Sequence, residues 1–331
     1  MDFTPAGSQQ AVAVLAAEVL AAPDPWKELA RAGLLDVSSL GVLDLTVLLT
    51  EIGRRVPSRK ALATLMTGAL PLLRWGRPGL VPAVASGELI LTAALREPSG
   101  PPATTVTDGT ITGTKVGVPY AAQAHRILVT ASSGVAIVDP AGVTLIRTPS
   151  SDGEPEYTVR MDGAPIEAML GGPDCARDTE ALATAGACAL ADGAVAGALS
   201  LTRDHVASRE QFGRPLAAFQ AVSQQIADVY IASRTLHLAT LSACWRLDAG
   251  PEMGPEMGPE MGTAAAADLD VAAYWCAEQA PRSVRICHHL HGGLGMDVTY
   301  PLPRFSSLVA DLVRFLGGAE YRLERQACSS T

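Results

Sequence analysis

The sequence predicts an α+β protein whose strands are confined to the middle of the chain. Three observations predict this class: helical spacing of apolar residues over positions 1–87, short β-branched runs between turn signals over 88–171, and long helical segments over 172–331. Segregation of strands from helices is typical of the α+β class. We therefore expect an N-terminal helical domain, a middle β domain and a C-terminal helical bundle with these boundaries.

The N-terminal region carries the spacing of several short helices. Ser8 is predicted to cap a first helix that runs through Leu20, where prolines end it. Further along, the sequence predicts a short amphipathic turn over 26–34 and helices over 42–54 and 60–73.

The middle region consists of short runs rich in β-branched residues. Strands are predicted over 111–118, 126–130 and 134–138, with turns at Asp108-Gly109 and Ser132-Ser133-Gly134. Strands this close together, without helices between them, predict a compact antiparallel barrel or sandwich.

The C-terminal region predicts an antiparallel helical bundle. Long helices are expected over 178–209, 216–248 and 263–291, followed by two shorter ones after Pro301 and Gly318.

The tetrapeptide Pro-Glu-Met-Gly occurs three times in a row over residues 251–262. Because proline and glycine recur every few residues, an exposed loop is predicted there. Two interpretations stay open for this loop, a docking segment and a repeat expansion without a function.

Composition excludes several classes of protein. The chain has 331 residues, with 25 Lys or Arg and 34 Asp or Glu, so its net charge is −9 and binding to nucleic acid or to a membrane surface is not expected. The nearly uncharged stretch 181–201 is long enough to cross a bilayer, but its central Asp192 favours a buried bundle helix. Six cysteines without a CxxC pair and the lack of a signal peptide predict a cytoplasmic protein, and we expect no metal site.

Two C-terminal motifs have the chemistry of an anion site. The segment Ser-Arg-Glu-Gln-Phe-Gly-Arg-Pro-Leu over 208–216 contains Arg209, whose planar guanidinium suits a pyrophosphate. Gln211 and Gln220 offer amide donors near the same place. In the segment His-His-Leu-His-Gly-Gly-Leu-Gly-Met over 288–296, the backbone N–H groups of two adjacent glycines can approach a phosphate closely.

These motifs, with the tail over 315–322, resemble the RxxFGxPLxxFQ, QxxGGxGxxxEYP and YEGT segments of the acyl-CoA dehydrogenase family of flavoproteins. The resemblance covers nearly the whole chain and implies that family's fold, with a trimmed N-terminal domain. It also implies FAD shared across a dimer, with the adenosine-pyrophosphate end held by the neighbouring subunit's bundle. Carried over, the cofactor-binding residues are Arg209, Gln211, Phe212, Gln220, His289, Gly292 and Gly293, with His289 in the place of the family's glutamine.

The resemblance also shows what is missing for catalysis. The family's general base stands in one of two places, which are occupied here by Leu316 and Ala183, and neither side chain can accept a proton. Glu180, one turn before Ala183, is the nearest substitute for the base. Its simpler interpretation is an acidic residue in the first turn of a helix, which the helix dipole favours. Glu320 has the simpler interpretation of a surface residue. No catalytic residue is therefore predicted in this chain.

The flavin-ring half of the site departs from the family pattern as well. Arg96 replaces the threonine of the TEP segment, Gly117 replaces the tryptophan that covers the ring, and Pro119 replaces the threonine that donates to it. One half of a shared site is thus present and the other half absent.

This division predicts a non-catalytic subunit that completes the FAD site of a homologous catalytic partner. It resembles the α2β2 actinobacterial acyl-CoA dehydrogenases that act on steroid side-chain thioesters, with the acyl-CoA bound mainly in the partner and an electron-acceptor flavoprotein downstream. Two alternatives stay open, a homomeric dehydrogenase with a relocated base and a non-enzymatic scaffold or binding module.

Overall fold

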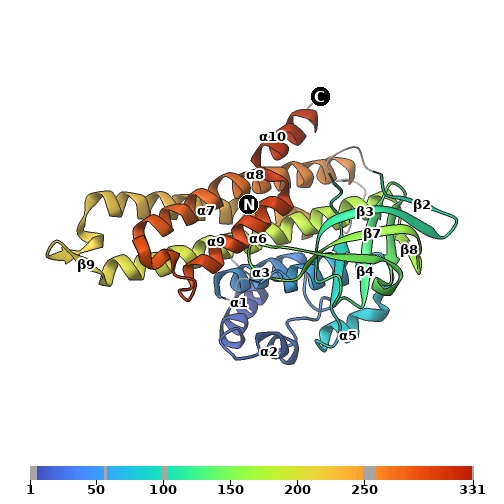
Figure 1. The fold of residues 1–331 in the computed structure, drawn as a ribbon, viewed down its shortest axis with the longest axis horizontal. Coiled ribbons are helices and arrows are strands. Elements are labelled where there is room, and N and C mark those ends of the chain that lie inside the picture. Colours follow the sequence, from blue (N-terminus) through green and yellow to red (C-terminus); the bar gives the residue numbers. More distant parts are fainter. Residues whose placement is uncertain (1–5, 56–57, 99–102, 249–257, 330–331) are drawn as a thin grey trace.

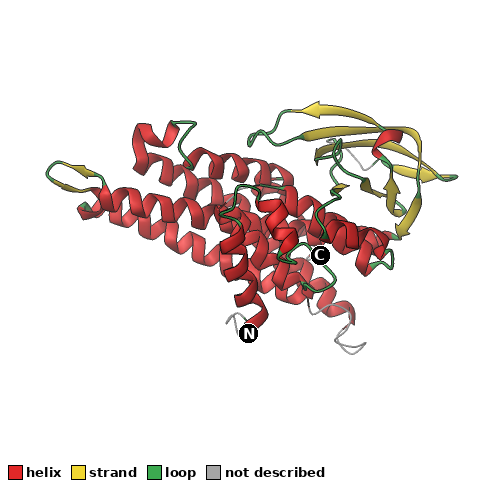
Figure 2. Ribbon diagram, turned by 90° about the horizontal axis from the view of Figure 1, so that it is seen from below, coloured by secondary structure: helices red, strands yellow, loops and turns green. Residues whose placement is uncertain are grey.

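The computed structural model describes residues 6–55, 58–98, 103–248 and 258–329. Figure 1 shows an elongated bundle of helices with β-sheets at one end and the N-terminal helices packed along one side. In the perpendicular view of Figure 2 the sheets again lie beside one end of the long helices. The predicted α+β class and order of regions are confirmed.

The N-terminal helices differ from the prediction in detail. The first helix begins at Gly7, so Ser8 lies inside it, and the predicted cap is wrong; the N–H of Ala6 instead donates to Gln9 Oε1 (2.9 Å). The helix predicted from residue 60 contains an eight-residue π-helical stretch. The elements here are α1 (Gly7–Val19), α2 (Pro25–Arg31), α3 (Val42–Arg55), η1 (Leu62–Ala69), α4 (Leu70–Arg74), η2 (Pro78–Leu80) and α5 (Val81–Ala85).

The strands of the middle region form two four-stranded sheets, in the orders β1-β4-β5-β8 and β2-β3-β7-β6. Neither sheet closes on itself within the described residues, so the arrangement has two open sheets and is not a barrel. The antiparallel prediction is wrong for β1 and β4, which run parallel because the chain forms β2 and β3 in the second sheet before it returns. The elements are β1 (Leu91–Ala94), β2 (Thr105–Thr107), β3 (Thr110–Pro119), β4 (Arg126–Ala131), β5 (Gly134–Val138), η3 (Pro140–Gly142), β6 (Thr144–Thr148), β7 (Glu156–Pro165) and β8 (Ala168–Gly171).

The long C-terminal helices are confirmed, with shifted ends. Of the repeat, residues 251–257 lie outside the described residues, whereas 258–262 begin a helix, so the loop prediction is wrong there. Proline fits the first helical turn, where its missing N–H is not needed. The elements are α6 (Pro173–Ser208), β9 (Glu210–Gln211), β10 (Arg214–Pro215), η4 (Leu216–Ala218), α7 (Gln220–Asp248), α8 (Gly258–His291), η7 (Gly292–Met296), α9 (Leu302–Leu316) and α10 (Gly318–Ser329).

Helix α6 lies in the centre of the main core, which the N-terminal helices and the bundle share. Its backbone touches that of α3, because a Cβ added at Gly193 would lie only 2.0 Å from the carbonyl oxygen of Thr50. The helix is apolar and long enough to cross a membrane, but 89% of its most apolar window is buried in the protein. The buried Asp192 at its centre lies 2.8 Å from His237 Nδ1. The prediction of a closely packed bundle helix is confirmed.

Candidate functional site

The first predicted anion-binding segment forms a tight hairpin after α6. β9 and β10 pair Gln211 with Arg214, and the two residues of the turn, Phe212 and Gly213, both have positive φ (55° and 77°). Positive φ at both central positions is the mark of a type I′ turn. A phenylalanine in this conformation is strained, and its side chain is 89% exposed.

A cluster of aromatic and cationic side chains stabilises the base of this hairpin. The Arg214 guanidinium lies 4.1 Å from the centre of the Phe219 ring, and Phe212 meets the same ring edge-on at 6.1 Å. The N–H of Leu216 donates to the carbonyl of Arg209 (2.9 Å), which closes the hairpin. These contacts lie at the base of the hairpin and leave Phe212 itself exposed.

The second predicted segment is the turn between α8 and α9. His289 is exposed in the last turn of α8, and Gly292, with φ +58°, opens the short 3₁₀ helix η7. A Cβ added at Gly292 or Gly293 would meet nothing within 4 Å, so the backbone is open on that side.

A pair of histidines brings the two segments together. The rings of His205, in the last turn of α6, and His291, at the end of α8, stack with 4.4 Å between their centres and 16° between their planes. Arg209 lies one helical turn after His205, and its N–H donates to the His205 carbonyl (2.8 Å). The predicted residues Arg209, Gln211, Phe212, Gln220, His289, Gly292 and Gly293 therefore lie at one end of the bundle, and this end is named the clamp.

The clamp contains groups of the kind that bind a diphosphate. Arg209 is exposed and makes no ion pair within the described residues. The 29-residue helix α7 begins at Gln220, so the positive end of its dipole lies at the clamp. The glycines at 292 and 293 leave room for an anion to approach the backbone closely, and an arginine and a helix N-terminus are usual means of binding a phosphate anion.

The clamp lies at the end of the bundle away from the sheets (Figure 1). Glu180, near the start of α6, is close enough to Arg96 of the middle region for its charge to act on that guanidinium. The end of α6 is 28 residues further along, which is about 42 Å of helix. A single dinucleotide cannot reach from the clamp of this chain to the sheets of the same chain.

At the sheet end, side chains of the chain itself link the strands to helix α9. Arg96 Nε donates to the carbonyl of Phe315 (3.0 Å), and the guanidinium lies over the Phe315 ring at 5.4 Å. Burial and the positive charge of Arg322 lower the pKa of Arg96, against the nearby carboxylate of Glu180. The cation predicted in place of a threonine thus bridges the sheet to α9.

An ion pair covers Gly117, the second altered position. Arg314 of α9 donates to both carboxylate oxygens of Glu156 (2.7 and 2.9 Å). A Cβ added at Gly117 would lie 3.9 Å from Arg314 Nη1 and 3.9 Å from Glu156 Oε1. The third altered position, Pro119, lies in β3 opposite Glu156.

The two base positions are buried and apolar. Leu316 and Ala183 are both fully buried, so neither offers a group that could take a proton. Glu180 is partly exposed and lies among cations, because its charge acts on Arg96, Lys115 and Arg325. Glu320 is exposed in the first turn of α10.

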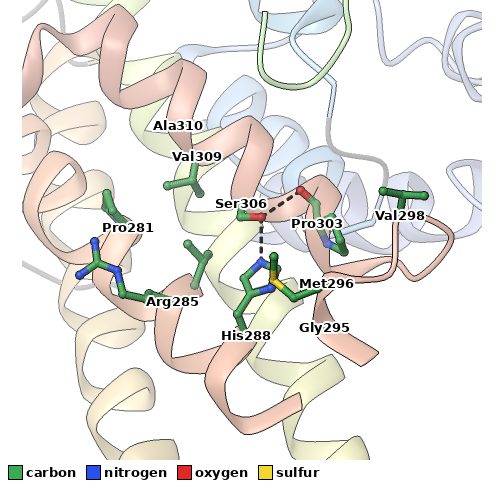
Figure 3. A pocket seen from close by; sticks show the side chains of 11 residues that line it. Pro281, Arg285, His288, Gly295, Met296, Val298, Pro303, Ser306, Val309 and Ala310 are labelled. Carbon is green, nitrogen blue, oxygen red and sulfur yellow. Dashed lines mark hydrogen bonds between the residues drawn. The ribbon is translucent and has the colours of Figure 1, made fainter. Parts of the chain in front are cut away.

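Beside the clamp is an apolar groove of about 590 Å³ between α8, η7 and α9 (Figure 3). His288 Nε2 lies 2.9 Å from the hydroxyl of Ser306, which donates to the Pro303 carbonyl, so these side chains join the two helices. Its lining residues are Pro281, Val284, Arg285, His288, Gly295, Met296, Val298, Pro303, Ser306, Val309 and Ala310.

Comparison with known proteins decides the family. A sequence profile described as "Acyl-CoA dehydrogenase, C-terminal domain" matches residues 179–324. The chain is 44% identical to Acyl-CoA dehydrogenase FadE28 of Mycobacterium tuberculosis over 347 residues, which cover 98% of this chain and 97% of that protein. The chain belongs to the acyl-CoA dehydrogenase family.

Two solved structures of this family resemble the chain in fold. One is the ChsE4-ChsE5 complex from Mycobacterium tuberculosis, with 28% identity, coverage of 98% of this chain and 97% of that one, and a TM-score of 0.88. The other is a variant of the steroid ACAD Tcur3481-Tcur3483, with 30% identity, 97% coverage of both chains and a TM-score of 0.85. Neighbours with the acyl-CoA dehydrogenase fold bind FAD.

Two features of the site were missed by the sequence analysis. The motif that carries the glycine pair contains His291, but its stacking partner His205 lies outside both motifs, and no local pattern marks it. The pairing of Arg314 with Glu156 joins residues 158 positions apart, and only the tertiary structure brings them together.

Proposed function

We propose that this chain is the non-catalytic subunit of a heteromeric, FAD-dependent acyl-CoA dehydrogenase and that its clamp completes the FAD pyrophosphate site of a catalytic partner subunit. FAD, when bound, supplies the acceptor for the hydride that leaves the acyl thioester. This chain's own contribution is to bind and orient the cofactor's diphosphate through Arg209, Gln211, Phe212, Gln220, His289, Gly292 and Gly293.

The observation that carries the proposal is the separation of the two half-sites along α6. The clamp has an exposed Arg209 without an ion pair in the described part of the chain, whereas Arg96 and the Arg314–Glu156 pair occupy part of the space between the strands and α9. A cofactor at the clamp would therefore need its ring pocket from a second molecule. A chain that used its own sheets for the same purpose would need that space open.

The surface of α7 supports a partner of the same fold. Ile231, Leu238 and Trp245 are exposed apolar residues spaced seven apart, so they share one face of the helix. Tyr230 adjoins them. An apolar heptad stripe on a bundle helix fits a second helical bundle, and we propose that the homologous catalytic subunit covers it in an α2β2 assembly.

The substrate class is proposed from the relatives. The Tcur3481-Tcur3483 protein is described as a steroid ACAD, so we propose a steroid side-chain CoA thioester as the acyl substrate, bound mainly in the partner. An electron-acceptor flavoprotein would reoxidise the flavin. The acidic chain and its reduced cysteines fit a cytoplasmic location.

Arg209→Ala in the purified complex tests the proposal. It removes a charge-assisted contact to an anion, worth roughly 1.5–3 kcal/mol, or about one to two powers of ten in FAD affinity. The two chains should still co-purify, because helices and not one exposed arginine hold them together. Flavin content per heterodimer in dilute solution is the measurement.

Arg203→Ala is the matched control, since Arg203 is also exposed near the end of α6 but pairs with its neighbour Asp204. Unchanged FAD affinity in Arg209→Ala, in an intact complex, would favour the scaffold alternative. An active, flavin-loaded homomer of this chain would favour the homomeric alternative.

A further inference from the structure

The two halves of the clamp belong to different helices, and an aromatic stack is the contact that joins them next to the anion-binding groups. His205 ends α6 and His291 ends α8, and their rings are nearly parallel at 4.4 Å. Each ring lies next to anion-binding groups: the carbonyl of His205 accepts the N–H of Arg209, and Gly292 follows His291 directly. A change in the stack therefore changes the spacing of Arg209 and the glycine turn.

The hydrogen bonds of His291 define its protonation. Its ring is buried, and Nδ1 lies 2.8 Å from the carbonyl of Cys287, which can only accept, so Nδ1 carries the hydrogen. Nε2 is buried and has no hydrogen-bond partner among the described residues. A second proton would place a charged, unpaired N–H in a site that excludes water, so the ring is held neutral.

The charges around the stack act in the same direction. Burial lowers the pKa of both imidazoles, and the positive charge of Arg209 lowers the pKa of His205 further. For His291, the hydrogen bond to the Cys287 carbonyl raises the pKa and protonated His205 or His288 would lower it, and the net shift is downward. Tyr300, whose ring centre is 5.3 Å from that of His291, has a pKa raised by burial and stays neutral. No carboxylate contacts either ring among the described residues.

We propose that His205 and His291 are a positioning pair that holds Arg209 and the Gly292–Gly293 turn at the spacing one diphosphate requires. The inference rests on the proposed function of the clamp. Neither ring needs to touch the cofactor. Because both rings are neutral when stacked, protonation places two like charges 4.4 Å apart and next to Arg209, which separates the halves of the clamp.

The sign of the pH effect follows from the lowered pKa values. A histidine whose pKa is lower in the folded state stabilises that state fully above its unfolded pKa, about 6.5, and the contribution is lost as the pH falls through the folded pKa. The clamp is therefore intact at neutral pH and loosens below about pH 6.5.

The test uses the complex of this chain with its catalytic partner and two substitutions of one residue. His205→Ala removes the ring, and we expect FAD to bind about three- to tenfold more weakly at pH 7.5, the range of an aromatic pair. His205→Phe keeps the ring without its charge, and we expect near-normal affinity at pH 7.5 and a smaller loss than the wild type at pH 5.5. His125→Phe, at an exposed position in the middle region, is the control.

A second measurement needs no cofactor. In the FAD-free complex, His205→Ala should speed amide hydrogen exchange at residues 292–294, on the other helix, and His205→Phe should not. Unchanged exchange there and unchanged FAD affinity in His205→Ala would overturn the inference. An acid loss of affinity in His205→Phe as large as in the wild type would also overturn it.

Failure of this inference differs from failure of the proposed function. If Arg209→Ala weakens FAD binding and His205→Ala does not, the clamp binds FAD without help from the stack. If Arg209→Ala has no effect, the proposed function fails, and the exchange measurement still decides whether the stack couples the two helices.

Discussion

Arg59 is the shared cation of a buried cluster of carboxylates, and its replacement by leucine should destabilise the protein strongly. Its side chain is only 5% exposed and lies in the segment between α3 and η1. Nε and Nη2 donate to the two carboxylate oxygens of Asp152 (2.9 and 3.1 Å), and Nη1 donates to Glu156 (2.7 Å). Asp311 of α9 accepts the N–H groups of Ser151 and Asp152 (3.0 Å each), so the cluster joins all three regions of the chain.

The magnitude follows from what Arg59→Leu leaves behind. Asp152 and Glu156 would stay buried without their shared cation, and breaking a buried ion pair from one side costs about 3–5 kcal/mol. Arg314 still pairs with Glu156, so we expect the lower end, about 3 kcal/mol. At about 2–4 °C per kcal/mol, the unfolding midpoint should fall by roughly 6–12 °C.

The pH dependence separates a lost ion pair from a simple packing defect. Burial raises the pKa of Glu156, but hydrogen bonds from Arg314 and Arg59 more than offset it, so the pKa is lowered. The stabilisation is therefore full above the unfolded pKa of about 4.3 and is lost as the pH falls through the folded value. The cost of Arg59→Leu should therefore be largest at pH 7 and smaller at about pH 3, well below the unfolded pKa.

Thermal unfolding followed by circular dichroism at pH 7 and about pH 3 is the assay. Arg147→Leu is the control, because Arg147 is an exposed residue of β6 that makes no ion pair within the described residues. A cost below about 1 kcal/mol, or one that is the same at both pH values, would refute the reasoning.

Three further outcomes are expected. Gly193→Ala should destabilise the protein by about 1–3 kcal/mol in thermal unfolding, because its Cβ would overlap the carbonyl of Thr50. Gly7→Ala, which has open space around it, is the control and should not destabilise the protein. Equal stability of the two variants would contradict the packing of α3 on α6. Glu180→Gln in the complex should leave turnover nearly unchanged, and a loss on the order of a thousandfold would identify Glu180 as the base. Purified without its partner, the chain should bind little FAD, as absorbance of the flavin would report, and a yellow, active homomer would contradict the proposal.

Local signals in the sequence predicted local structure well. Asp108 and Gly109 form the predicted turn, both with positive φ, because these residue types tolerate that conformation. Helix α9 starts after Pro301 and ends at Gly317, whose φ of +86° makes a left-handed C-cap. The motif spacing also led to the correct family, because both C-terminal motifs occur at the expected distance from each other.

Local signals in the sequence did not predict contacts between residues that are far apart in the chain. Arg96 was recognised as a departure from the family pattern, but its hydrogen bond to the Phe315 carbonyl spans 219 positions. The parallel pairing of β1 with β4 depends on where β2 and β3 go, and strand propensity does not contain that information. The parts that sequence could not supply are thus those fixed by the packing of one region on another.

The strained backbone at Phe212 also supports a shared site. A bulky residue with positive φ costs about 1–2 kcal/mol relative to glycine, and 89% exposure means that little burial offsets this cost within the chain. The next residue of the same turn, Gly213, is a glycine, so a glycine would also be tolerated at position 212. Backbone strain that packing inside the chain does not offset indicates a contact with another molecule. The exposed ring at the tip of the hairpin therefore supports a clamp whose ligand and partner come from another molecule.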